Sequence, residues 1–219
     1  SLMKFDCFLC MCEGSTAEYR FVFLHRFCRI HKLKFTDQFL RDFADCMKFT
    51  EDSLSFDFFE HPTLYKEKNF NAIFVKIMQY FHGYQLKRLS IVRLYVHSLG
   101  NADIMRLIHS NSTSLISLEL FNLHLGHDLL MNASFSVHLP NLERLVVYMG
   151  RYCINNLTFG KKITWFELPI SFVFPKIKDG VISLEEKNEV NVYTQNLLGF
   201  FSAFPHLECV VFHKHCFIF

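Results

Sequence analysis

LKRLSIVRLYV at residues 86–96 returns in changed form as LISLELFNLHL at residues 115–125. Both phrases have apolar residues at their first, fourth, sixth and eleventh places. Looser copies are LERLVVYMGRY at residues 142–152 and LECVVFHKHCF at residues 207–217. The first three copies start 29 and 27 residues apart, a spacing typical of solenoids, in which one structural unit repeats along the chain.

The alternation within each phrase predicts a short strand with one buried face. The fourth and sixth places are apolar, and their neighbours are polar or variable, which is the period-two pattern of a half-buried strand. One such strand cannot bury its apolar face alone, so each copy must stack on the next. The residues expected to point inward are Leu89, Ile91, Leu118, Leu120, Leu145, Val147, Val210 and Phe212.

The segments between the phrases are expected to supply the outer wall of the array. Residues 101–114 place Ile104, Leu107 and Ile108 at helical spacing, and residues 191–204 repeat this pattern. A wall of helices behind a row of strands follows from this alternation.

The same pattern extends to less regular stretches of the chain. Residues 36–47 predict a helix with Thr36 or Asp37 as its N-cap, and residues 70–81 predict another. SLSFDFF at residues 53–59 alternates as a strand does. ITWFELPISFV at residues 163–173 fits the phrase if its proline, Pro169, sits beyond the ladder or at a bulge.

We therefore predict an α/β fold that is an irregular leucine-rich-repeat solenoid, with short parallel strands on the concave face and helices on the convex face. Residues 1–29 are expected to form an N-terminal segment or cap, and residues 30–219 an array of about six to eight repeats, beginning with IHKLKF. The ninth place of such repeats usually carries Asn or Cys. It carries Leu94, Leu123, Gly150 and His215 here, which predicts that the asparagine ladder is missing.

Composition narrows the partner classes. The net charge is only +2, with both signs mixed along the chain, which argues against nucleic acid and against a membrane surface. No run of eighteen apolar residues is present, and the first residues do not form a secretory signal. The eight cysteines lack paired spacing, which favours reduced thiols and a cytoplasmic or nuclear location. The 27 phenylalanines are expected to fill gaps between imperfect repeats.

No catalytic motif is found. The sequence has no nucleophile elbow, phosphate loop or metalloprotease helix, and its glycines do not cluster as phosphate-binding loops require. We therefore predict that the protein is not an enzyme and uses no cofactor. Sequons at Asn111, Asn132 and Asn156 are short patterns that arise by chance.

A zinc site is the alternative interpretation of the N-terminal cysteines. CFLCMC at residues 7–12 contains a CxxC, and a second ligand set is available at His25, Cys28 and His31. The apolar residues between the cysteines favour buried free thiols instead, so we predict no metal. The tail residues His213, His215 and Cys216 could also bind a metal ion. We favour the interpretation that these histidines are surface residues without a metal.

LPNLERLVV, FPHLECVVF and SLISLELFNL resemble the leucine-rich-repeat portion of F-box proteins, over about residues 30–217. In that family an F-box binds the Skp adaptor of a cullin ubiquitin ligase, and the repeats hold the substrate. No F-box is found in residues 1–29. The resemblance implies a substrate-recognition module, which would bind a Skp-type adaptor only through an F-box outside this chain. The alternative is a generic intracellular scaffold with no ligase role.

The partner-binding surface is expected between the leucines. Side chains at the third, fifth and seventh places of each phrase should face outward on the concave sheet, where repeat proteins bind protein partners. Aromatic residues and arginine dominate the energy of many interfaces. The predicted binding residues are Arg88, Ser90, Ser117, Glu119, Phe121, Arg144, Tyr148, Trp165, Glu167 and His213.

Overall fold

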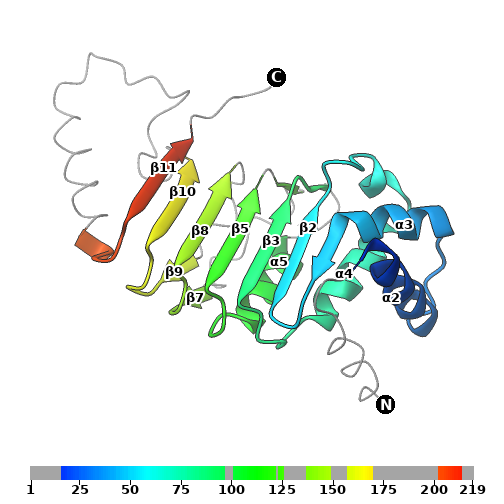
Figure 1. Ribbon diagram of the computed structural model, residues 1–219, viewed down its shortest axis with the longest axis horizontal. Coiled ribbons are helices and arrows are strands. Elements are labelled where there is room, and N and C mark those ends of the chain that lie inside the picture. Colours follow the sequence, from blue (N-terminus) through cyan, green and yellow to red (C-terminus); the bar gives the residue numbers. More distant parts are fainter. Residues whose placement is uncertain are drawn as a thin grey trace.

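The computed structural model describes residues 16–96, 101–121, 123–125, 137–148, 157–169 and 202–213. They form an α/β fold around one mostly parallel, seven-stranded sheet (Figure 1). Strand β1 pairs antiparallel with β2, and the later pairings of this sheet are parallel. The strands lie side by side in chain order: β1 (Met47–Phe49), β2 (Ser53–Asp57), β3 (Arg88–Val92), β5 (Ser117–Phe121), β8 (Arg144–Tyr148), β10 (Trp165–Pro169) and β11 (Cys209–His213).

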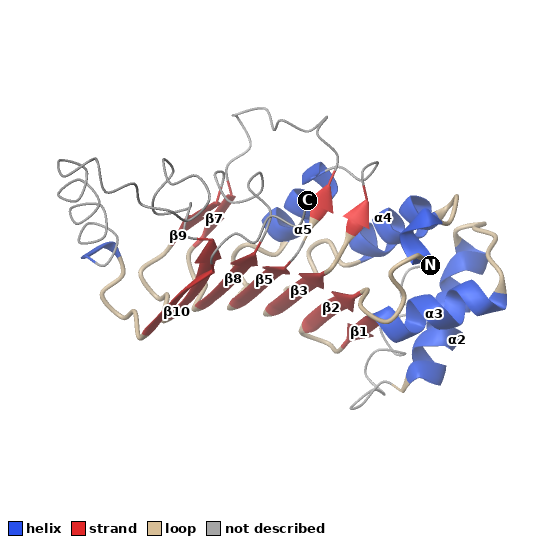
Figure 2. Ribbon diagram, turned by 90° about the horizontal axis from the view of Figure 1, so that it is seen from above, coloured by secondary structure: helices blue, strands red, loops and turns tan. Residues whose placement is uncertain are grey.

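One side of the sheet is covered (Figure 2). The helices α4 (Phe70–Tyr80) and α5 (Asn101–Ser110) lie there, with two short strand pairs. These pairs join β4 (Tyr95–Val96) to β6 (His124–Leu125), and β7 (Val137–Leu139) to β9 (Leu157–Phe159). The helices α2 (Ala17–Ile30) and α3 (Asp37–Cys46) lie at the β1 end, and a 3-10 helix, η2 (Leu64–Lys66), precedes α4. We call the side facing away from α4 and α5 the open face.

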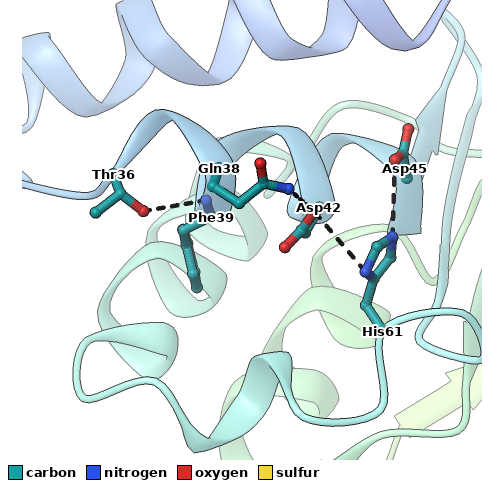
Figure 3. Close-up of polar contacts among 6 residues, drawn as sticks. All are labelled: Thr36, Gln38, Phe39, Asp42, Asp45 and His61. Carbon is teal, nitrogen blue, oxygen red and sulfur yellow. Dashed lines mark hydrogen bonds and ion pairs between the residues drawn. The ribbon is translucent and has the colours of Figure 1, made fainter.

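The helices begin where capping chemistry allows. The hydroxyl of Thr36 accepts a hydrogen bond from the backbone N–H of Phe39 at 3.2 Å (Figure 3), which confirms Thr36 as the N-cap of α3. Thr16 caps α2 in the same way, accepting from the N–H of Tyr19 at 3.3 Å. The inward stripe expected of α5 is also confirmed, because Ile104, Leu107 and Ile108 are fully buried.

The inward residues of the strands form the predicted column. Within the described side chains, those of β3, β5 and β8 at the fourth and sixth places are at most 2% exposed, and Val210 of β11 is half-buried. The side chain of Phe212 lies outside the described residues. Period-two alternation therefore predicted the buried face of the sheet correctly. The confirmed set is Leu89, Ile91, Leu118, Leu120, Leu145 and Val147.

Successive parallel strands begin with the same backbone junction. The carbonyl oxygen of Lys87 accepts hydrogen bonds from the N–H groups of both Ile116 and Ser117, at 2.8 and 3.0 Å. The same shared acceptor recurs before each described parallel strand of the large sheet. The accepting residues are Asp52, Lys87, Ile116, Glu143 and Thr164. The chain therefore repeats a backbone geometry as well as a hydrophobic pattern.

Phenylalanine fills the β1 end of the molecule. The rings of Phe43, Phe56, Phe58, Phe70 and Phe74 are at most 1% exposed and lie in mutual contact where α3 and α4 meet the sheet. Several of these contacts are edge-to-face, the arrangement that the ring quadrupole favours. Many of the phenylalanines are thus part of the hydrophobic core.

Three details differ from the sequence prediction. The segment beginning at Ile30, where the array was expected to start, holds the end of α2 followed by a turn and a loop. Strand β1 begins at Met47, the last residue of the helix predicted at residues 36–47. The outer wall is not helical throughout, because β7 and β9 occupy it behind β8 and β10. Pro169 is the last residue of β10, opposite His213, rather than outside the ladder. The pairing of β10 with β8 ends at Glu167. The backbone N–H that Pro169 lacks is therefore not needed for pairing with β8.

Several predicted features lie outside the described residues. These are CFLCMC with Cys7, Cys10 and Cys12, the tail residues His215 and Cys216, the sequons at Asn132 and Asn156, Gly150, and the helix at residues 191–204 except for its last positions. The domain boundary predicted near residue 30 falls at the end of α2, and the number of repeats stays a prediction.

Candidate functional site

The predicted binding residues form rows across the open face. Because the strands are parallel and in register, Arg88, Ser117, Arg144 and Trp165 occupy equivalent positions along one row. A second row contains Ser90, Glu119, Val146 and Glu167, and a third contains Val92, Phe121 and Tyr148. His213 pairs with Pro169 at the end of β11. The side chains of Tyr148 and His213 lie outside the described residues.

Trp165, Arg144 and Glu167 form a connected cluster. The indole Nε1 of Trp165 donates to Oε1 of Glu167 at 2.8 Å, and Nη2 of Arg144 lies 3.4 Å from the same oxygen. The guanidinium carbon of Arg144 is 5.3 Å from the centroid of the indole ring, within the range of a cation–π contact. These contacts limit the rotamers of two residue types that contribute strongly to interfaces.

Val146, at the fifth place of its phrase, was expected to face outward, and it does so, but its side chain is covered. Its side chain is only 2% exposed. Val146 does point to the open face, but it lies between Glu119 of β5 and Glu167 of β10. Longer side chains on both neighbouring strands shield a short one, so alternation alone predicts direction but not exposure.

A hollow of about 560 Å³ lies on the open face beside α3. Strand residues form its floor, and the loop after β2 and the end of α3 contribute to its wall. Its charged side chains include four carboxylates and two cations. The lining residues are Asp45, Cys46, Lys48, Ser55, Asp57, Phe59, Glu60, Ser90, Val92, Arg93, Glu119 and Phe121.

Sequence analysis found Ser90, Glu119 and Phe121 but missed most of this hollow. The outward position of Asp57 in the alternating strand β2 could have indicated it. Arg93 could not have been found this way, because its backbone has φ of 58° and leaves the strand pattern. The guanidinium carbon of Arg93 lies 4.2 Å from the ring centroid of Phe59, and its Nη1 is 3.5 Å from Oδ1 of Asp57.

His61, in the loop after β2, lies beside two carboxylates of α3 (Figure 3). Its Nε2 lies 3.7 Å from Oδ2 of Asp45, and its Nδ1 lies 3.9 Å from Oδ1 of Asp42. The Oδ1 atom of Asp42 also accepts a hydrogen bond from Nε2 of Gln38 at 2.7 Å. Both imidazole contacts are longer than hydrogen bonds, so they act as ion pairs when His61 is protonated.

The described residues give the zinc interpretation no support. Within them, no group of three or more His, Cys, Asp or Glu side chains is placed to hold a metal ion. Cys28 is buried on α2 between exposed His25 and His31. Burial raises the pKa of the Cys28 thiol to about 12. The other half of the proposed ligand set lies outside the described residues.

Burial should also protect two thiols from chemical modification. The pKa of Cys46 is raised to about 12, mainly by burial and further by Asp45, Asp57 and Asp42. We expect Cys28 and Cys46 to react with a thiol reagent only on unfolding at neutral pH, and the partly exposed Cys209 to react before these two. Peptide mapping after timed alkylation measures this order.

The same pKa shifts predict how stability depends on pH. Above the ordinary thiol pKa, near 9, the thiols of Cys28 and Cys46 are deprotonated in the unfolded chain but stay protonated in the folded chain. The free energy of unfolding should therefore fall as the pH rises towards 12. Denaturant titrations of wild type and Cys46→Ala, compared between pH 8 and pH 10, measure the contribution of this thiol. A smaller decrease in the variant is expected, and an equal decrease would contradict it.

No protein-family model, curated protein or solved structure matches the chain. Helices that are both long and apolar enough to cross a bilayer are absent from the described part.

Proposed function

We propose that the chain is a protein-binding module that engages its partner through the open face of the sheet. The observation that carries this proposal is the cluster of Arg144, Trp165 and Glu167, in which an arginine and a tryptophan are held on the open face by one carboxylate. Holding such side chains in place before binding reduces the entropy lost on association.

The repeat interpretation of the fold is part of this proposal. The shared backbone acceptor at five strand junctions and the in-register parallel strands support an irregular leucine-rich-repeat solenoid with the open face as its concave side. Such arrays expose one continuous sheet surface, and side chains from several strands contribute to one binding site.

The narrower proposal is a substrate-recognition part of a cullin ubiquitin ligase in the cytoplasm or nucleus. Its support is the resemblance of LPNLERLVV and FPHLECVVF to the repeats of F-box proteins. Co-purification of the full-length gene product with a Skp-type adaptor would support the ligase role. Partner binding without an adaptor, from a gene encoding no F-box, would favour the generic scaffold.

Arg144→Ala is expected to remove partner binding with little change in stability. The Arg144 side chain is half exposed, at 50%, and exposed ion pairs contribute about 0–1 kcal/mol to stability, so the melting temperature should stay nearly unchanged. Quantitative mass spectrometry of proteins bound to wild type and variant measures the loss. The matched control is Arg106→Ala, which removes an exposed arginine from α5 on the covered side.

Two outcomes would contradict the proposal. Equal recovery of every partner by Arg144→Ala and wild type would exclude this cluster from the interface. A large fall in the melting temperature of Arg144→Ala would show that the side chain is part of the core.

A further inference from the structure

We propose that the hollow on the open face binds a basic segment of the partner protein, with a lysine or arginine over Glu119 and a neighbouring apolar side chain against Phe59. This inference rests on the proposed protein-binding function and adds the chemistry of the partner. Charge, exposed aromatic surface and the size of the hollow carry it.

The hollow is acidic although the chain as a whole carries a small positive charge. Its lining carries twice as many carboxylates as cations, whereas the net charge of the chain is +2. One of the two cations, Arg93, is paired with Asp57 at 3.5 Å. A concentration of carboxylates in a concave surface favours a cationic ligand, since the surrounding low-dielectric walls strengthen the local field.

Glu119 distinguishes this hollow from the rest of the face. It is partly buried on the central strand β5, where its Oε2 accepts a hydrogen bond from the Ser90 hydroxyl at 2.7 Å. No cation among the described residues forms an ion pair with it. By contrast, Glu167 in the same row is paired with Arg144. A partly desolvated carboxylate gains from a charge-assisted hydrogen bond, and a lysine or arginine of the partner supplies it.

The apolar half of the site is equally specific. The Phe59 side chain is 60% exposed, whereas Phe56 and Phe58, just before it in the chain, are buried. Its ring is held from one side by Arg93, at 4.2 Å, and its backbone N–H donates to Oδ1 of Asp57 at 3.0 Å. Val92 and Phe121 are half-buried beside it. An exposed ring held in place and adjoining apolar side chains favours an apolar contact from the partner.

The dimensions suit a few side chains of a peptide. The volume of about 560 Å³ lies within the range of roughly 300–1,000 Å³ found for ligand clefts. The hollow opens onto the face that carries the Arg144 cluster, so a segment bound in it leads to the surface already proposed for the partner. A protein segment therefore fits better than an isolated small cation.

Selection from a random-peptide phage library against the immobilised protein tests the inference. We expect enriched peptides to carry lysine or arginine next to an aromatic or aliphatic residue. A fluorescent synthetic copy of the most enriched peptide should bind Glu119→Gln about 10-fold to 100-fold more weakly, because a hydrogen bond to a charged group is lost. Its affinity should also fall as the salt concentration rises.

Glu143→Gln is the matched control. Glu143 is exposed just before β8 and outside the hollow, so the same change of charge there should leave peptide affinity within about twofold of wild type. Phe59→Ala should weaken binding as Glu119→Gln does. Both variants should melt at nearly the wild-type temperature, since Phe59 is exposed and glutamine can still accept from Ser90.

The outcomes separate this inference from the proposed function. The basic-segment inference would be overturned if the enriched peptides carried no basic residues and bound Arg144→Ala less well than wild type. That result would still support partner binding through the open face. Basic peptides whose affinity is unchanged in both Glu119→Gln and Phe59→Ala would overturn the inference as well. Failure to enrich any peptide would contradict peptide binding in the hollow. The proposed binding of partners through the rest of the open face would still be tested by the proteins recovered from cells with wild type and Arg144→Ala.

Discussion

Replacing Asn111 with alanine is expected to lower the free energy of unfolding by about 3 kcal/mol. The Asn111 side chain is only 1% exposed. Its Oδ1 accepts from the N–H of Leu86 at 3.0 Å, and its Nδ2 donates to the carbonyl oxygens of Leu107 at 2.9 Å and Phe81 at 3.2 Å. It thereby joins the end of α5 to the turn that leads into β3. Alanine leaves the N–H of Leu86 without its acceptor, and a buried group that loses its partner costs about 1–3 kcal/mol. The carbonyl oxygens of Leu107 and Phe81 lose one bond each but still accept from the Ser110 hydroxyl and the N–H of Tyr84.

Asn141→Ala is the matched control for this effect. The Nδ2 of Asn141 also bridges two units, donating to the carbonyl oxygen of Thr113 at 2.7 Å, but this bond is exposed. Water can replace it, so we expect a loss of under about 1 kcal/mol. Urea titration followed by circular dichroism compares the two variants. Equal losses would mean that burial does not determine the cost, and would contradict the role given to Asn111.

Asn111 also shows why part of the fold could not be predicted. The sequence analysis expected a missing asparagine ladder because the ninth place carries neither Asn nor Cys, and two of the residues found there, Leu94 and Leu123, are buried in the core. A buried asparagine nevertheless joins adjacent units, from the end of a helix instead of the strand turn. The Asn-Ser-Thr pattern at this position looks like a glycosylation sequon, but the folded protein hides its amide.

The strands with regular alternation were predictable, and the exceptions have physical causes. The phrase at residues 115–125 gave the inward residues of β5 because its apolar places repeat with period two. The short β1 was missed because Met47 continues the apolar stripe of α3 and is equally buried in either state. Propensity cannot separate a last helical turn from a three-residue strand when both bury the same side chain.

The residues that face outward on the sheet could be predicted, but the hollow between them and α3 could not. Ser90 and Glu119 were predicted to face outward from their places in the repeat, and the register of β3 and β5 puts them side by side. The hollow needs residues from other sources: Asp45 from α3, and Phe59 from the loop after β2. Nothing in a repeat pattern places a helix end beside a strand, because that position is set by the packing of phenylalanine beneath it.

Phe56 is a central residue of that packing. Phe56 lies on β2 and is fully buried. Its ring centroid is 4.8 Å from that of Phe74 on α4, and 6.2 Å from those of Phe43 on α3 and Phe58. One ring therefore contacts side chains of both α3 and α4. The neighbouring rings are large and rigid, so they cannot easily collapse into a vacated space.

Phe56→Ala is therefore expected to cost about 3–5 kcal/mol of unfolding free energy, because it removes a buried ring and leaves a cavity. That is a large share of the roughly 5–15 kcal/mol of a typical domain. Phe59→Ala is the matched control: the same deletion three residues along the chain, at a side chain that is 60% exposed, should change stability by under about 1 kcal/mol. Chemical denaturation measures both. Similar losses would show that the two rings are equally buried in solution, which would remove Phe59 from the proposed binding hollow.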